Sequence, residues 1–258
     1  MAFPAGWITP QWPVAADVRA VCSTRSGGRS RAPYDSLNLG DHVGDAPEDV
    51  ASNRALFVQA LQARPVFLKQ VHGLETVQLA ADTPDGTQAD GCVTTATRVA
   101  CTIMVADCLP VLFAADTGHA VAAAHAGWRG LAQGAGCNIL EAVWTRFRDA
   151  AELRAPTQAL AWLGPCIGPE AFEVGPEVKA AFESNDPAAA ALFKFHRDGR
   201  WLADLPALAR RRLNALGITR IYGNDGSRAW STVADPLNFF SHRRDRISGR
   251  FAASIWLA

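Results

Sequence analysis

The sequence predicts an α+β fold, in which mixed β-sheets are flanked by helices within one domain that spans residues 1–258. Short apolar runs typical of buried strands outnumber helical patterns, and the two do not alternate in a strict βαβ order. Proline and glycine are spread along the chain without marking a linker or an internal repeat. With 258 residues, 49% of them hydrophobic, the chain can bury a large core without disulfides.

Strands are expected where short apolar runs are bounded by turn residues. Residues 100–106 and 111–115 are continuous apolar runs, as in strands that are buried on both faces. Residues 66–71 and 76–79 flank a His-Gly pair, which predicts a β-hairpin. Further strands are expected at residues 18–23, 120–124 and 251–257.

Three helices are expected, at residues 131–147, 176–182 and 203–216. In the first, Ile139, Val143 and Phe147 recur at helical spacing. The second begins with a proline at a first-turn position, and the third ends before a glycine.

Composition excludes several classes of protein. Lys and Arg number 25 and Asp and Glu number 25, so the chain lacks the basic excess of a nucleic-acid binder. The most apolar stretch, residues 99–115, contains Asp107 and Pro110 and is too short to span a bilayer. The first residues lack a leader pattern, and the six cysteines form no CxxC pair. We therefore expect a cytoplasmic protein with free thiols that acts on a small molecule, without nucleic acid, membrane or an obligate protein partner.

Four chemistry-bearing residues stand at the ends of expected strands. His72 follows the run at 66–71, and Asp107 and Cys108 lie between two apolar runs. His125 ends a fourth run. One Cys and two His form a common zinc set that leaves a fourth position open, as in catalytic zinc sites. The spacing matches no local zinc motif. Taken alone, a cysteine is more often a core residue than a ligand, and a histidine is more often a hydrogen-bonded structural residue than a ligand.

Ten segments together resemble one protein family. They are STRSGG (23–28), YDSLNLG (34–40), HVGD (42–45), KQVHG (69–73), ADG (89–91), ADCLPVLF (106–113), AAAHAGWRG (122–130), LGPCIGPEAFEVG (163–175), FFSHRRD (239–245) and SGRFAASIWL (248–257). The sequence is similar, from about residue 10 to 257, to the family first named for a laccase or multicopper polyphenol oxidase domain. The same family is also called the peptidoglycan editing factor or purine nucleoside phosphorylase family.

The resemblance implies α/β/β/α layers of mixed sheets, similar to the catalytic domain of cytotoxic necrotizing factor toxins. It implies His72, Cys108 and His125 as metal ligands, with zinc as the expected ion and copper as the alternative. The implied activity is phosphorolysis of adenosine, inosine, guanosine and methylthioadenosine, with adenosine deamination at the same site. Family members are also linked to copper-dependent oxidation and to removal of misincorporated serine from a muropeptide precursor.

On this resemblance, the expected catalytic residues are Cys108, His125 and Asp107, with Asp107 carrying protons during deamination. Arg25 and Arg243 are expected to bind phosphate, because a guanidinium suits an anion. Asn38 is expected to contact the ribose or the base.

The sequence departs from the family pattern at two positions. Ser231 stands where many members have a cysteine, and a serine cannot replace a thiolate ligand. His242 stands where the family usually has tyrosine.

Three alternatives stay open at this point. A metal-free hydrolase would use Cys108 as nucleophile and His125 as base, for example on an amide of a muropeptide precursor. A zinc-stabilised or partner-binding scaffold without turnover would be supported by a closed site with a fourth protein ligand, for which Cys101 and Cys166 are the obvious thiols. A copper polyphenol oxidase would need more clustered histidines than the six in this chain.

Overall fold

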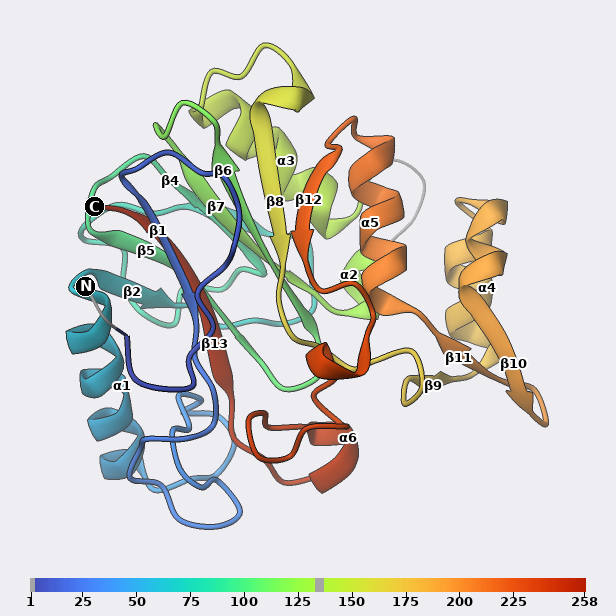
Figure 1. Ribbon diagram of the computed structural model, residues 1–258, viewed down its shortest axis with the longest axis horizontal. Coiled ribbons are helices and arrows are strands. Elements are labelled where there is room, and N and C mark those ends of the chain that lie inside the picture. Colours follow the sequence, from blue (N-terminus) through green and yellow to red (C-terminus); the bar gives the residue numbers. More distant parts are fainter. Residues whose placement is uncertain (1–2, 133–136) are drawn as a thin grey trace.

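The computed structural model describes residues 3–132 and 137–258, and its chain forms two large β-sheets (Figure 1). The first sheet has four strands in the order β1-β13-β5-β2. The outer pairs differ in direction, since β1 is antiparallel to β13 while β2 is parallel to β5. The strand bounds are β1 Val18–Cys22, β13 Phe251–Leu257, β5 Val99–Val105 and β2 Arg64–Phe67.

The second sheet has six strands in the order β12-β8-β6-β7-β4-β3. Its central pair, β6 and β7, is antiparallel, whereas β12 and β8 are parallel at one edge. The bounds are β12 Arg220–Gly223, β8 Ala159–Leu163, β6 Leu109–Ala115, β7 Val121–Ala126, β4 Gly91–Thr94 and β3 Thr76–Gln78.

The two sheets pack face to face with helices outside. One apolar cluster joins the inward side chains of both sheets, among them Ile103, Leu112 and Trp162. A second cluster packs α3 (Ile139–Ala150) and α5 (Leu205–Ala215) on the other face of the six-stranded sheet. A third packs α1 (Pro47–Leu61) on the outer face of the four-stranded sheet. These α/β/β/α layers confirm the α+β class with mixed sheets.

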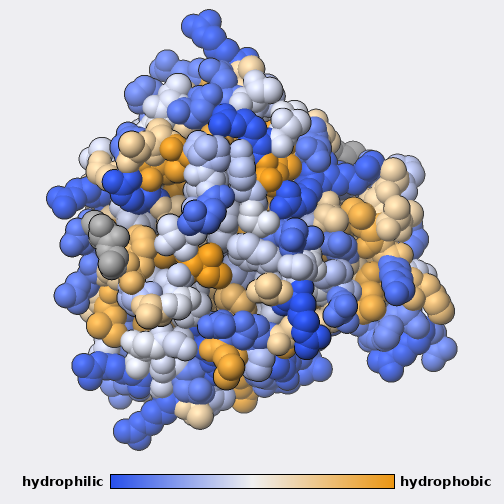
Figure 2. Space-filling model, viewed as in Figure 1, coloured by the Kyte–Doolittle hydropathy of each residue, from blue (hydrophilic) through white to orange (hydrophobic). Residues whose placement is uncertain are grey.

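A small arm projects from this body at the right of Figure 1. It contains α4 (Pro176–Glu183) and an antiparallel sheet of β10 (Phe193–Arg197), β11 (Arg200–Ala203) and β9 (Glu173–Val174). Figure 2 shows a notch between this arm and the body, on a face that is mostly hydrophilic with small separate apolar patches.

The remaining elements are short. They are α2 (Trp128–Ala132), α6 (His242–Asp245) and three 3-10 turns at Pro156–Gln158, Pro187–Leu192 and Arg228–Trp230. All six cysteines are free thiols, as the sequence predicts. Within residues 3–132 and 137–258, no helix has the length and apolar character needed to cross a membrane.

Two predictions about elements were wrong. Residues 66–71 and 76–79 do not form a hairpin, because β2 and β3 belong to different sheets. The backbone of Val71 to Gly73 donates its amides to the carboxylate of Asp90 instead of to a partner strand.

The helix expected at 131–147 also differs, since α3 begins only at Ile139 and continues to Ala150. Asn138 and Glu141 form a capping box that starts this helix, a signal within the expected span. Residues 133–136 of the expected helix lie outside the described residues.

Candidate active site

Strand pairing places Cys108 and His125 side by side. Cys108 immediately precedes β6, and His125 is the penultimate residue of β7. In the antiparallel register, Pro110 pairs with His125 and Leu109 pairs with Ala126, so Cys108 stands at the same edge as His125. The convergence of strand ends is therefore a direct result of the β6–β7 pairing.

His72 reaches this edge from the loop that follows β2. Its Nε2 lies 3.6 Å from the Cys108 Sγ, and its ring centroid lies 4.7 Å from that of His125. The three side chains offer ligand atoms that all lie within 4.8 Å of one another. The structure thus brings together the three residues expected to bind metal.

The loop that carries His72 is anchored on both sides. Gln70 bonds to the backbone of β5, with its Nε2 donating to the Met104 carbonyl and its Oε1 accepting the Met104 amide. Asp90, which is fully buried, accepts the amides of Val71, His72 and Gly73. These bonds hold His72 at a left-handed backbone angle, φ 62°.

Asp90 also bonds to the second histidine. Its Oδ1 lies 2.8 Å from the His125 Nδ1, and its backbone carbonyl accepts the His125 amide at 2.7 Å. Because Nδ1 is engaged by the carboxylate, Nε2 is the His125 nitrogen left for the cluster.

The cluster strongly perturbs the ionisation of its members. Burial alone would raise the pKa of the Cys108 thiol, but the charge and hydrogen bonds of His125 and His72 outweigh it and lower the pKa to about 6. Burial alone would lower the pKa of His125, but the Cys108 thiolate and Asp90 raise it to about 9. Burial likewise opposes ionisation of Asp90, yet bonds from His125 and Gly73 lower its pKa. At neutral pH and without metal, the pair is therefore a thiolate and an imidazolium.

The donor set fits a metal ion. One sulfur and two imidazole nitrogens suit zinc, and a soft thiolate also suits copper. Sulfur and nitrogen ligands of one tetrahedral zinc ion would lie roughly 3.6 Å apart at the usual bond lengths. The Cys108 Sγ and His72 Nε2 have this separation, 3.6 Å. Gly127 keeps the space open, because a Cβ there would lie 3.0 Å from both Cys108 and His72.

The cluster opens into a cavity of about 440 Å³. Apolar side chains form part of its lining, including Met104, Trp128, Ile167, Phe172 and Leu205. Its polar lining includes His42, Gln70, Asp107, His242, Arg243, Arg246 and Arg250.

Three arginines give this cavity a cationic character. None of Arg243, Arg246 and Arg250 forms an ion pair with a carboxylate among the described residues. Arg243 donates to the carbonyls of Ala171 and Glu173, and Arg250 to those of Ser248 and Gly249. Burial lowers the pKa of Arg250, and the negative charges of Cys108 and Asp107 partly offset this decrease.

Asp107 lines the cavity with both carboxylate oxygens engaged. Oδ1 accepts the Thr232 hydroxyl and Oδ2 accepts the Arg243 amide, each at 2.6 Å. Its φ is 100°, a left-handed value that turns the chain sharply between β5 and β6. Asp107 thereby connects the turn that carries Cys108 to the start of α6.

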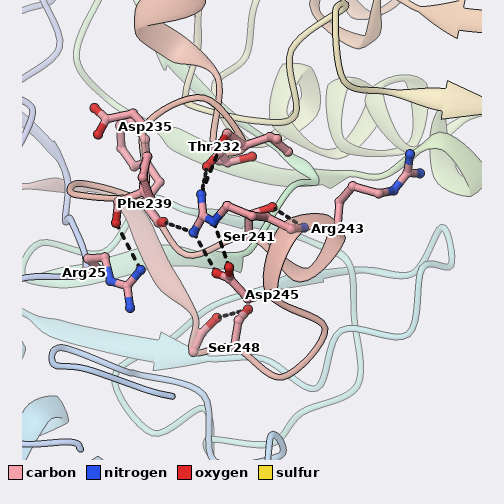
Figure 3. Close-up of polar contacts among 12 residues, drawn as sticks. Arg25, Thr232, Asp235, Phe239, Ser241, Arg243, Asp245 and Ser248 are labelled. Carbon is pink, nitrogen blue, oxygen red and sulfur yellow. Dashed lines mark hydrogen bonds and ion pairs between the residues drawn. The ribbon is translucent and has the colours of Figure 1, made fainter. Parts of the chain in front are cut away.

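The segment around α6 is held by a separate network (Figure 3). Arg244 donates to the carbonyls of Thr232 and Phe239 and pairs with Asp245. Figure 3 shows the side chain of Arg243 pointing away from this network. Its guanidinium lies instead over the Phe172 ring, 5.6 Å from the centroid.

The structure does not bring Arg25 and Asn38 into the cavity. Arg25 pairs with Asp35 at 3.3 Å and donates to the Pro236 carbonyl, beside a smaller recess of about 220 Å³. Asn38 is fully buried, and its Oδ1 accepts the backbone amide of Arg250 at 2.8 Å.

The positions that depart from the family pattern, and the two extra thiols, also have defined places. Ser231 accepts the amides of Gly168 and Ala234 outside this cavity, whereas His242 lines it. Cys101 and Cys166 are buried and do not belong to the three-residue cluster found in the described part of the chain.

Sequence reasoning gave no role to four residues that shape the site: Gln70, Asp90, Arg246 and Arg250. Asp90 does carry a sequence signal, because it immediately precedes an apolar strand, where a carboxylate needs a partner. The roles of Gln70 and the two arginines depend on contacts between segments far apart in the chain, which no local pattern reports.

This fold and site define a two-sheet α/β/β/α protein with a Cys-His-His cluster of metal-ligand type in a cationic cavity. The family model described as multi-copper polyphenol oxidoreductase laccase matches residues 19–258, and the chain belongs to this family.

Named relatives are similar over nearly the whole chain. A protein named purine nucleoside phosphorylase from Pseudomonas aeruginosa is 47% identical, over 97% of this chain and 98% of its own. Purine nucleoside phosphorylase YfiH of Escherichia coli is 46% identical over the same shares. Protein NMB0706 of Neisseria meningitidis has a crystal structure with a TM-score of 0.90 and 43% identity, covering 98% of this chain and 99% of that one. YlmD of Geobacillus stearothermophilus has a TM-score of 0.84 and 30% identity, covering 95% and 93%.

Proposed function

We propose that this protein is a zinc-dependent purine nucleoside phosphorylase that acts on adenosine, inosine, guanosine and methylthioadenosine and also deaminates adenosine. The observation that carries the proposal is one cavity lined both by the Cys-His-His cluster and by three arginines without carboxylate partners among the described residues. The names of the Pseudomonas and Escherichia relatives support the phosphorylase part.

Phosphate is the proposed partner of the arginines. In phosphorolysis, a phosphate oxygen bonds to the anomeric carbon of the ribose while the N-glycosidic bond breaks and the base leaves with a proton. The enzyme must therefore hold an anion close to the sugar. Arg243 and Arg250 have guanidinium groups fixed by backbone carbonyls, which orients their remaining N–H donors. Asn38 supports this arrangement from outside the cavity by accepting the Arg250 amide. Arg25 was expected to bind phosphate but lies outside the cavity, and its Nε instead donates to the Asp35 carbonyl in the loop that leads to Asn38.

The apolar lining is the proposed contact surface for the nucleoside. Phe172, Trp128 and Met104 offer flat or polarizable faces to a purine, which is an aromatic ring system. A cavity of about 440 Å³ is in the range of small-molecule sites.

His72, Cys108 and His125 would hold the zinc ion, which when bound supplies a Lewis acid in the cavity. Asp107 is the proposed proton carrier for deamination. Its two hydrogen bonds fix the carboxylate beside the cluster as an acceptor.

The test is release of hypoxanthine from inosine with and without phosphate. We expect phosphate-dependent release that is lost in Cys108→Ala. Arg250→Gln should raise the KM for phosphate about 10- to 100-fold, the effect of losing one charged hydrogen bond. The matched control is Arg148→Gln, because Arg148 is an exposed residue of α3 paired with Asp149. Release that does not depend on phosphate would contradict the proposal.

A second candidate is a metal-free thiol hydrolase acting on an amide such as a muropeptide precursor. The observation in its favour is that Asp90, His125 and Cys108 follow one another in the order of a Cys-His-Asp triad. A bound metal would occupy the Cys108 sulfur, so metal content separates the two candidates. Copper oxidation would instead require copper in the purified protein.

A further inference from the structure

We propose that Asp90 is a positioning residue that prepares two metal ligands at once, fixing the tautomer of His125 and the backbone of His72. The proposal deepens the proposed function, since it rests on a metal bound by the cluster. It does not depend on which nucleoside is the substrate.

The first effect is on His125. The carboxylate of Asp90 can only accept hydrogen bonds, so the His125 Nδ1, 2.8 Å away, is the donor. When a metal displaces the Nε2 proton, the remaining proton is therefore held on Nδ1, and the lone pair of Nε2 faces the cluster. A second bond, from the His125 amide to the Asp90 carbonyl, fixes the backbone of the same ligand. Carboxylates that orient metal-binding histidines in this way strengthen metal binding.

The second effect is on the loop of His72. Three successive amides, those of Val71, His72 and Gly73, converge on the Asp90 carboxylate at 3.1, 2.9 and 2.8 Å. These bonds replace the strand pairing that the loop lacks, and they stabilise the left-handed conformation of His72. One fully buried side chain thus connects two ligands whose strands, β2 and β7, belong to different sheets.

An amide at position 90 cannot meet both demands. If its oxygen faces the His125 Nδ1 and the His72 amide, its NH2 group faces the amides of Val71 and Gly73. These groups are all donors, so no hydrogen bond forms between them. If the amide is reversed, its NH2 group faces His125, which must move its proton to Nε2 to accept. That tautomer has no lone pair at Nε2 for a metal.

Zinc binding to the purified protein, without nucleoside, tests the proposal. We expect Asp90→Asn to weaken zinc about 10- to 100-fold, measured by competition with a chromophoric chelator. The matched control is Asp204→Asn, the same carboxylate-to-amide change at the residue that caps α5 by accepting the Ala207 amide. It should bind zinc as the unmodified protein does. Unchanged affinity in folded Asp90→Asn would overturn the proposal.

A double-variant cycle separates the two effects. Asp90→Asn should weaken zinc binding by a smaller factor in protein that already carries His72→Ala than in the unmodified protein. The part of the effect that acts through His72 is already lost there. An equal penalty in both backgrounds would overturn the role of Asp90 toward His72.

A measurement on the unmodified protein keeps the proposal falsifiable even if Asp90→Asn fails to fold. Nitrogen-15 spectra of the zinc-loaded protein should show the His125 proton on Nδ1, and a proton on Nε2 would overturn the proposal. If the unmodified protein binds no zinc at all, the proposed function fails instead, so the two failures are distinguishable.

Discussion

The ionisation of Cys108 in metal-free protein gives a quantitative test of the site. With a pKa of about 6, half of the thiol is thiolate at pH 6. An ordinary thiol with a pKa of 9.0 is about 0.1% thiolate at that pH, so the thiolate fraction favours Cys108 about 500-fold. The nucleophilicity of a thiolate falls with its pKa, by about 20-fold for a pKa lower by three. Cys108 should therefore react about 20-fold faster than an ordinary thiol at pH 6.

The assay is alkylation by iodoacetamide after removal of metal, followed as a function of pH. The background variant is Cys137→Ala, because Cys137 is exposed and the other four cysteines are buried. The rate should rise with a midpoint near pH 6 and stay high above it, since the thiolate is the form present above the pKa. His125→Ala removes the main stabilising cation and should move the midpoint up toward 9. A midpoint above about 8 in the parent protein would refute the electrostatic reasoning.

Three further predictions concern the same site. At pH 7.4, zinc binding should release about one proton, because His125, with a pKa of about 9, is protonated until the metal displaces its proton. Calorimetry in two buffers of different ionisation enthalpy measures the number of protons released. Thr232→Val should lower the free energy of unfolding by about 1–3 kcal/mol in urea titrations, because Asp107 would no longer accept a hydrogen bond from the buried Thr232 hydroxyl. Gly127→Ala should weaken zinc binding, since its Cβ would approach the Cys108 sulfur to 3.0 Å.

Each of these has a contrary outcome. Binding heats that do not depend on the buffer would show that His125 is neutral before zinc binds. Thr145→Val is the control for Thr232, because Thr145 bonds within α3 at an exposed position, and an equal loss in both variants would remove the special role of the Asp107 contact. Wild-type zinc affinity in Gly127→Ala would show that the cluster has room for a methyl group.

Some strands of this chain can be predicted from the sequence, whereas the loop after β2 cannot. The runs at β5, β6 and β13 are apolar at almost every position, and all three strands are buried along their full length. Continuous apolar runs of this length are typical of strands covered on both faces. The loop after β2 has no such pattern, and the expected hairpin failed because a distant carboxylate, Asp90, takes the amides that a partner strand would otherwise take.

Part of the site can likewise be predicted from the sequence, and part cannot. His72, Cys108 and His125 could be found from the sequence because each places a donor atom at the end of an apolar run, and such ends converge when the runs become neighbouring strands. Arg250 could not, because its place in the cavity depends on Asn38, a residue more than 200 positions earlier in the chain. Contacts of that range follow from the packed fold and not from any local pattern.

Metal content combined with phosphate dependence tests the central claim most directly. The protein is purified without added metal, its zinc and copper are quantified, and hypoxanthine release from inosine is followed with and without phosphate. We expect about one zinc per chain and release that requires phosphate and the Cys108 thiol. A metal-free protein that cleaves a seryl-muropeptide and leaves inosine intact would contradict this expectation.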